Sequence, residues 1–429
     1  MTQNQTLNYE RAEALRNSKN YADACQKFAE LWQQSPSHFI GWRYAFCLRK
    51  LGQLEDAERI AREALAKFPD DKYTKSTLAW ILYDKELKPA KERSDLGHII
   101  RVANQILTLN SDKMILTKVV LAVMKVAKHR KNWQTLLEWS DRVRAEDLDN
   151  QPMSFNSKHG MSEREVWYVN RANTLLQLER FDEARRFAQA ALADFPNEVF
   201  LRRTAALALA RSGDLATGIV EMRSLLTHPR ADWYMKAELA ELEYLSGNYS
   251  EAYRLICDSM STSRQSVEFK LEYFVTLAQI ALALGKLDIA AEHIALARAV
   301  RIDQGWKIPS ALVQVEQDIR AALKESSRDW PILPRDSKQL ERICRRRWQE
   351  GATEGVQFFR GTVKPYPEGR HFAYIKRDDG GEDVYVLVRD LPRNCNQPYS
   401  RVEFALKKGY DKKKDRESVQ ATNVRCIQE

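Results

Sequence analysis

The chain has 429 residues, 44% of them hydrophobic and 30% charged, and its formal net charge is +9. This length allows two or three domains with a buried core. The high charge and the lack of any apolar run of about 18 residues exclude a membrane-spanning chain. Residues 1–5 have neither the basic nor the apolar segment of a secretory signal, so we expect a cytoplasmic protein.

The spacing of the cysteines indicates their redox state, and the distribution of charge indicates the kind of partner. The cysteines are far apart and include no CxxC pair, a spacing that predicts reduced thiols rather than a zinc site or a disulfide framework. Residues 335–429 hold 21 Lys and Arg against 15 Asp and Glu, so this end carries +6 of the net charge. A locally basic segment favours a polyanionic partner. The cysteines are Cys25, Cys47, Cys257, Cys344, Cys395 and Cys426.

Residues 1–325 contain a repeated helix–turn–helix pattern. A small residue recurs in the second helix of each unit, with spacings of 34, 34 and 38 residues in the later part of the array. A glycine marks several of the turns, and a proline ends several units because it cannot continue a helix. The recurring small residues are Ala24, Ala57, Ala184, Gly218, Ala252 and Ala290.

This period and these positions resemble the tetratricopeptide repeat. The resemblance implies a mainly α fold, a right-handed helical-repeat solenoid with about eight repeats in residues 1–325. Residues 78–165 keep the helical period but have longer connections, so we expect degenerate repeats there. Solenoids of this family usually hold a protein partner in their concave groove.

The repeat pattern predicts where two groups of side chains in the array should lie. The tryptophans should lie in the core between repeats, and three polar residues are candidates for the partner-binding groove. A peptide-carboxylate clamp would need Asn and Lys or Arg at matched positions of successive repeats, and that match is incomplete. The tryptophans are Trp32, Trp42, Trp80, Trp133 and Trp233, and the candidates are Asn170, Asn173 and Arg203.

Residues 326–355 are predicted to link the array to the next domain. Prolines at the start and glycines at the end of this segment enclose one helix, at about residues 337–350, which contains the basic run Arg345-Arg346-Arg347. Two interpretations remain open. The run is either the solvated face of a linker helix or an extension that contacts phosphates.

From residue 356 to residue 429 the hydrophobic period changes from 3.6 to 2. Five short strands separated by glycines are expected, which fits a small all-β barrel of the OB type. The residue order resembles a cold-shock domain. Matching positions are Gly361, Val363 and Lys364 in the first strand, Phe372, Tyr374 and Ile375 in the second, Asp379-Gly380 in the turn, Val384-Tyr385-Val386 in the third, and 401–406 and 421–424 in the last two.

The sequence also departs from that family. A tryptophan of the family is Pro365 here, two glycines are His371 and Ala373, and a histidine and an aromatic residue are Leu387 and Val388. Two base-stacking positions are thereby lost. This departure favours weaker binding, narrower sequence choice, or partial conversion of the surface to protein contact.

Strand alternation places the remaining aromatic residues together. Phe372 and Tyr374 are two residues apart and share a face, and Tyr385 should join them from the next strand. Exposed rings in this arrangement stack unpaired bases. Lysines at residues 407–417, in an expected loop, are further candidates for phosphate contact. The predicted nucleic-acid-binding residues are Lys364, Tyr366, Arg370, His371, Phe372, Tyr374, Lys376 and Tyr385.

No nucleotide-binding or hydrolase motif is found, and the seven histidines have no metal-ligand spacing. We therefore expect neither an enzyme nor a cofactor, metal or small-molecule substrate. The sequence predicts an adaptor that binds single-stranded RNA or DNA, with RNA favoured, through the barrel and a protein through the array. The alternative is a pure protein-interaction scaffold whose barrel is a docking domain.

Overall fold

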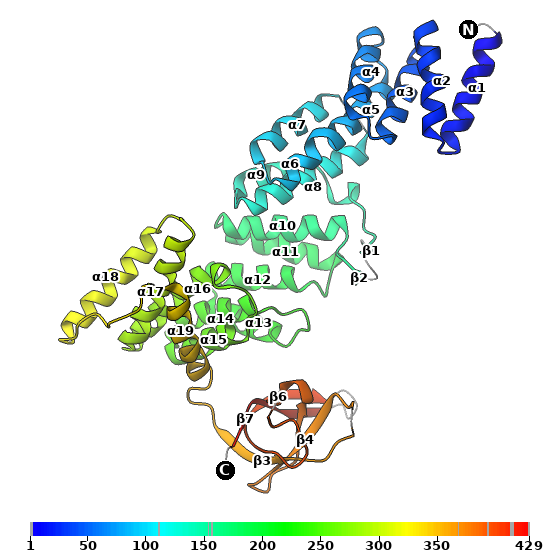
Figure 1. Ribbon diagram of the computed structural model, residues 1–429. Helices are drawn as coiled ribbons and strands as arrows, with labels where there is room; N and C mark the ends of the chain where they lie inside the picture. The colour runs from blue at the N-terminus through cyan, green and yellow to red at the C-terminus, as the bar shows by residue number, and fades with distance from the viewer. Residues whose placement is uncertain are drawn as a thin grey trace. The chain divides into compact units, whose positions relative to one another are not determined.

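The computed structural model describes residues 3–109, 112–152, 154–155, 158–367, 369–392, 394–411 and 416–427. A helical array of the tetratricopeptide type is followed by a closed β-barrel, so the predicted fold class is confirmed (Figure 1). The chain divides into two compact units, residues 1–230 and 231–429. None of the described helices is long and apolar enough to cross a membrane.

The first unit consists of successive helices that pack against their neighbours in the chain. One hydrophobic core extends from Ala12 to Trp167, and Trp32, Trp80 and Trp133 lie in or against it. The helices are α1 Gln3–Asn17, α2 Tyr21–Gln34, α3 His38–Lys50, α4 Leu54–Lys67, α5 Lys72–Leu82, α6 Lys88–Glu92, α7 Leu96–Thr108, α8 Lys113–His129, α9 Trp133–Ser140, α10 Glu163–Gln177, α11 Phe181–Asp194, α12 Val199–Arg211 and α13 Leu215–Leu225.

The irregular part of this unit coincides with the degenerate stretch of the sequence. A π-helical turn, Tyr83–Leu87, joins α5 to α6, so part of the extra length is helical. A 3-10 turn, Ala145–Asp147, and two short paired strands, β1 Ser154–Phe155 and β2 Lys158–His159, precede α10. Ser162 and Glu165 then form a capping box that begins α10.

The recurring small residues lie where paired helices approach closely. All five alanines are fully buried. At Gly218 in α13, a Cβ atom would lie 2.5 Å from the Cβ of Ala210 in α12, too close for any side chain. In the turns between paired helices, one residue has a left-handed backbone conformation with positive φ. In half of these turns that residue is not glycine. The non-glycine residues are Lys19, Ser94, Lys131 and Glu179.

The second unit begins with six helices, of which the last packs back onto two earlier ones. Helix α19 contacts α15 and α17. Its Leu340, Cys344 and Trp348 form a buried stripe. The segment predicted as a linker therefore contains a helix that is part of the helical fold. The helices are α14 Trp233–Leu245, α15 Tyr249–Thr262, α16 Leu271–Ala283, α17 Leu287–Asp303, α18 Ser310–Glu325 and α19 Ser337–Gly351, with a 3-10 turn at Val267–Lys270.

The barrel has the strand order β3-β4-β5-β7-β6 and closes between β6 and β3. All neighbours are antiparallel except β5 and β7. Residues 407–411 and 416–417 belong to a paired hairpin, which corrects the expected loop at 407–417, and Lys412, Lys413 and Lys414 lie outside the described residues. The strands are β3 Phe358–Val363, β4 Phe372–Arg377, β5 Val384–Leu387, β6 Arg401–Asp411 and β7 Arg416–Cys426, with a 3-10 turn at Val388–Asp390.

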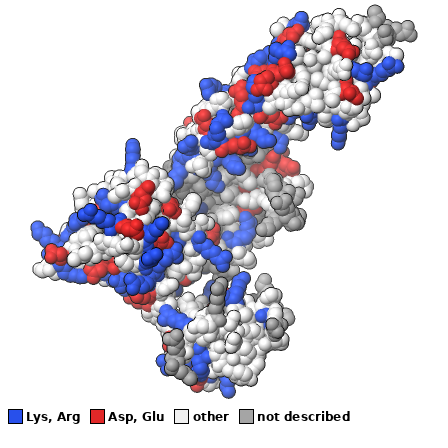
Figure 2. Space-filling view, in the orientation of Figure 1, with Lys and Arg blue, Asp and Glu red and all other residues white. Residues whose placement is uncertain are grey.

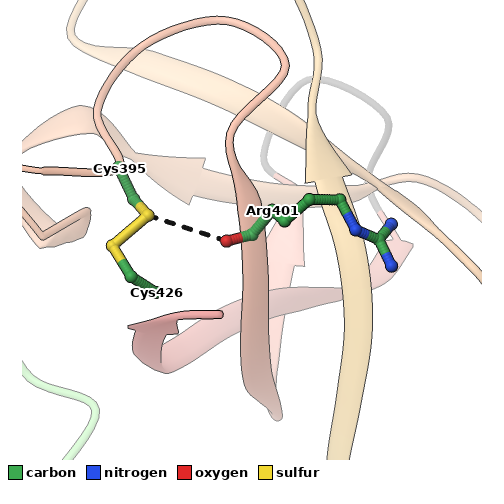
Figure 3. Close-up of a disulfide and its surroundings, with 3 residues drawn as sticks. All are labelled: Cys395, Arg401 and Cys426. Atoms are coloured by element: carbon green, nitrogen blue, oxygen red, sulfur yellow. Dashed lines mark hydrogen bonds between the residues drawn. A yellow bond between two sulfur atoms is a disulfide. The ribbon is translucent and has the colours of Figure 1, made fainter. Parts of the chain in front are cut away.

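The expectation of reduced thiols is wrong for one pair. Cys395 and Cys426 form a disulfide, whereas the other four cysteines are free and buried (Figure 3). Cys426 lies opposite Val402 at the end of the β6–β7 ladder, and the Sγ of Cys395 lies 3.6 Å from the carbonyl oxygen of Arg401. The disulfide joins Cys395, in the loop before β6, to the end of β7, 31 positions later in the sequence.

Candidate nucleic-acid interface

Strands β4 and β5 have one apolar face toward the barrel core and one aromatic face toward solvent. Ala373 and Ile375 of β4 are buried, as are Val384 and Val386 of β5. The residues between them point the other way because side chains alternate along a strand. The outward residues include Tyr374, which is 43% exposed.

Three of the outward side chains form a continuous aromatic surface, called here the aromatic platform: Phe372, Tyr374 and Tyr385. The rings of Phe372 and Tyr385 are nearly parallel, with centroids 5.4 Å apart. Tyr374 lies directly opposite Tyr385 in the strand register and meets both rings edge-on, at 6.0 and 6.1 Å. The platform therefore offers a broad surface of ring faces and edges to a ligand.

Three basic side chains lie around the platform, and they differ in the groups that they contact. Lys376 is exposed on β4 and shares the outward face with Phe372 and Tyr374. Lys364 is also exposed, but its ammonium group forms an ion pair with Asp383. The guanidinium of Arg370 lies 4.1 Å from the ring centroid of Phe372, in cation–π contact. Of these three cations, Lys376 is the best placed to meet a phosphate.

The other predicted residues line a groove beside the platform. Tyr366, Arg370 and His371 form part of its wall, and the Tyr366 hydroxyl donates a hydrogen bond to the carbonyl of Asn396. The groove has a volume of about 1010 Å³. Its remaining lining residues are Gly369, Leu387, Val388, Arg389, Leu391, Asn396, Gln397 and Pro398.

Sequence reasoning missed this groove. Leu387 and Val388 stand where the cold-shock family has stacking residues, yet both line the groove, and Arg389 adds a cation. Strand β5 ends at Leu387 and a 3-10 turn, Val388–Asp390, follows it, so the alternation that places Tyr385 does not extend to Val388 and Arg389. The barrel face in view in Figure 2 carries more Lys and Arg than Asp and Glu.

The three partner-binding candidates of the array lie on α10 and α12 and join a basic residue of α8. Lys128 donates a hydrogen bond of 2.8 Å to the side-chain oxygen of Asn170, and Arg203 donates one of 3.3 Å to that of Asn173. Surrounding protein atoms, and secondly the charge of Arg203, lower the pKa of Lys128. Lys128 was not predicted because it belongs to the degenerate part of the repeat pattern.

The candidate site has no group of metal-ligating side chains. Among the residues that the structure describes, no three His, Cys, Asp or Glu side chains are close enough together to hold a metal ion. The arrangement instead offers aromatic rings, cations and amides, which bind by stacking, charge and hydrogen bonding.

Comparison with known proteins finds the repeat in the N-terminal part of the chain. A tetratricopeptide-repeat family model matches residues 15–81. A tetratricopeptide repeat protein from Parabacteroides merdae is 13% identical, with 65% of this chain and 99% of that chain covered and a TM-score of 0.31. The human IFIT1 dimer with PPP-AAAA is also 13% identical, with 79% and 80% covered and a TM-score of 0.38. No curated protein matches the chain.

Proposed function

We propose that this protein is a non-enzymatic adaptor whose barrel binds single-stranded nucleic acid, RNA in preference to DNA, and whose helical array binds a protein. The aromatic platform is the observation that carries the first part. Unpaired bases stack on exposed rings, and each stacked base contributes about 1–3 kcal/mol. Lys376 and the cations of the groove can meet the phosphates that follow each base.

The strand order supports an OB-type assignment of the barrel. The first strand, β3, pairs with the fourth, β6, and the third, β5, pairs with the fifth, β7. In OB folds, the face of the second and third strands is the one that binds oligonucleotides. The aromatic platform lies on those two strands, β4 and β5. The resemblance to cold-shock domains agrees with this assignment.

The protein-binding part of the proposal depends on the repeat architecture. Stacked helix pairs present extended surfaces to which a partner chain binds. The cluster of Lys128, Asn170, Asn173 and Arg203 adds two cations and two amides from three helices on such a surface. Deletion of the array should abolish copurification of a specific protein and leave nucleic-acid binding in place.

A fluorescence-anisotropy titration of the full chain with a labelled ten-nucleotide poly-U strand tests the nucleic-acid part. The triple substitution Phe372→Ala, Tyr374→Ala, Tyr385→Ala should weaken binding by more than about a hundredfold, since three stacking contacts are lost. Tyr399→Ala is the matched control, because Tyr399 is an exposed aromatic of the same barrel outside the platform. A duplex of equal length should bind less tightly.

A second candidate function for the barrel is protein docking. The groove supports it, because Leu387, Val388, Leu391 and Pro398 give it an apolar lining that a protein side chain would fill. Unchanged affinity of the triple variant for poly-U would sink the stacking proposal and favour this second function.

A further inference from the structure

Helix α3 presents an aromatic stripe away from the core of its own repeat. Its buried residues include Ile40, Ala45 and Leu48, whereas Phe39 and Trp42 lie on the other side of the helix, three residues apart. Phe46, one turn further on, is partly buried against the core and contacts Tyr21 of α2. Phe39 is 50% exposed, and Tyr73 on α5 beside the stripe is 53% exposed. Trp42 was expected in the core but contacts Tyr73 and two arginines instead.

Side chains from three helices hold these rings in place. We call the group the aromatic–arginine surface: Tyr9 and Arg16 of α1, Phe39, Trp42, Arg43 and Phe46 of α3, and Tyr73 of α5. The Trp42 and Tyr73 rings are stacked, with centroids 5.6 Å apart at 24°. Arg43 lies 4.2 Å from the centroid of Trp42 and 5.4 Å from that of Tyr9. A surface fixed in this way loses little conformational entropy when a ligand binds.

This surface has more positive charge than its own carboxylate neutralises. Glu13 accepts hydrogen bonds from both Arg16, at 2.6 Å, and Arg43, at 2.9 Å, so one carboxylate serves two guanidinium groups. Those bonds, chiefly the one from Arg16, lower the pKa of Glu13 to about 2. Lys50 and Lys72 add exposed ammonium groups beside Phe46 and Tyr73.

The faces of the Trp42 ring are already in use. In the aromatic platform, Phe372 is likewise covered by Tyr385 and Arg370, but Tyr374 meets its neighbours edge-on and is 43% exposed. Trp42 is stacked against Tyr73 and is also in cation–π contact with Arg43. A nucleobase stacks on a free ring face. The exposed ring edges and Phe39 instead offer apolar contact to side chains of a bound chain. Stacked guanidinium groups still direct N–H donors sideways, where they bind carboxylates. Arg16 and Arg43 use some of these donors on Glu13, Asn17 and the carbonyl of Phe39, so a ligand carboxylate would bind the remaining ones.

We infer that the aromatic–arginine surface binds an extended protein segment in which Asp or Glu residues are interspersed with large apolar residues. The carboxylates would pair with Arg16, Arg43 and the nearby lysines, and the apolar side chains would cover Phe39, Trp42 and Tyr73. This inference rests on the proposed protein-binding role of the array, and it assigns that role to the first repeats rather than to the cluster around Asn173.

Two labelled ten-residue peptides test the inference on the full chain. In the first, Asp and Glu alternate with Leu and Phe, and in the second Asn and Gln replace the acidic residues. The acidic peptide should bind at least tenfold more tightly than the amide peptide. Trp42→Ala, Arg43→Ala and Tyr73→Ala should each weaken its binding at least fivefold. Arg59→Ala is the control, because Arg59 is an exposed arginine on α4 that pairs with Asp56.

The ten-nucleotide poly-U strand is titrated against every variant in parallel. Unchanged helical circular dichroism and melting temperature would show that each variant is folded, and a loss of poly-U affinity specific to Trp42→Ala would make this surface a nucleic-acid site and overturn the inference. Equal binding of both peptides, or of neither, would overturn it as well. If Asn173→Ala or Arg203→Ala abolished peptide binding while Trp42→Ala did not, the inference would be wrong but the proposed role of the array would stand.

Discussion

At the scale of single residues, Asp383 determines how much positive charge the aromatic platform presents to a ligand. Its ion pair with Lys364 partly neutralises that lysine, whereas Lys376 has an exposed ammonium group on the same face as the rings. Both lysines are predicted to bind phosphates, but their surroundings give them different expected roles.

Asp383→Asn should therefore strengthen binding of the poly-U strand about two- to fivefold and steepen the salt dependence, since Lys364 becomes available. Lys376→Ala should weaken binding and flatten the slope of log K against log salt by about 0.7, the value for one phosphate contact on a single strand. Glu403→Gln, which changes the charge of the barrel elsewhere, is the control for Asp383→Asn. Equal slopes for wild type and Lys376→Ala would contradict the assignment of Lys376.

The sequence predicts the position of a residue where a regular strand or helix period determines which way its side chain points. Alternation in β4 and β5 is enough to place Phe372, Tyr374 and Tyr385 on one face and the valines on the other. The places of Tyr366 and Arg389 depend on how two loops fold, and no local pattern encodes that. The Cys395–Cys426 disulfide could not be predicted for the same reason, because Cys395 lies in a loop whose fold brings it to the end of β7.

At the scale of elements, α19 shows how a short amphipathic helix becomes part of the array. Trp348 stacks on Phe274 at 5.6 Å and donates an indole N–H to the Nε2 of His293 at 2.8 Å. Arg347 pairs with the buried carboxylate of Glu292. The helix and its basic run were visible in the sequence, but its docking site was not, since α15 and α17 are about 50 to 100 residues earlier.

The contact between α19 and His293 should make the second unit sensitive to acid. The Nδ1–H of His293 donates to the carbonyl of Ile289, so Nε2 is free to accept from Trp348 only while the ring is neutral. Burial, and to a lesser extent the charge of Arg347, lower the pKa of His293 to about 4. The unfolded chain would protonate this group near pH 6.5, so stability is lost as the pH falls from about 6.5 to about 4, by up to about 3 kcal/mol.

Chemical unfolding followed by tryptophan fluorescence at pH 7 and pH 4.5 measures this loss. His293→Gln keeps a hydrogen-bond acceptor without a titrating ring, so the variant should lose less stability between the two pH values than the wild type. Trp348→Phe keeps most of the packing but removes the donor, and should lower stability at pH 7. An identical acid response in the wild type and His293→Gln would rule out His293 as the cause.

At the scale of the whole molecule, the end of the helical fold is set by α19 rather than by the prolines that precede it. The prediction of a linker at 326–355 depended on those prolines and on the glycines at 351 and 355. Because Leu340, Cys344 and Trp348 are buried, a cut within α19 would expose apolar surface on α15 and α17. The available separation point is the short stretch from Ala352 to Gln357, between α19 and β3.

Fragments that end on either side of α19 should therefore behave differently. A fragment of residues 1–354 should remain monomeric and keep the helical circular dichroism expected for its length. A fragment of residues 1–336 should melt at a lower temperature and associate, because burial of a tryptophan and two smaller apolar side chains is worth several kcal/mol. The complementary barrel, residues 355–429, contains the whole platform and should bind the poly-U strand about as tightly as the full chain. If residues 355–429 folded but bound poly-U far more weakly, the array would have to contribute directly to nucleic-acid binding. The proposal that the barrel alone binds nucleic acid and the array binds a protein would then be wrong.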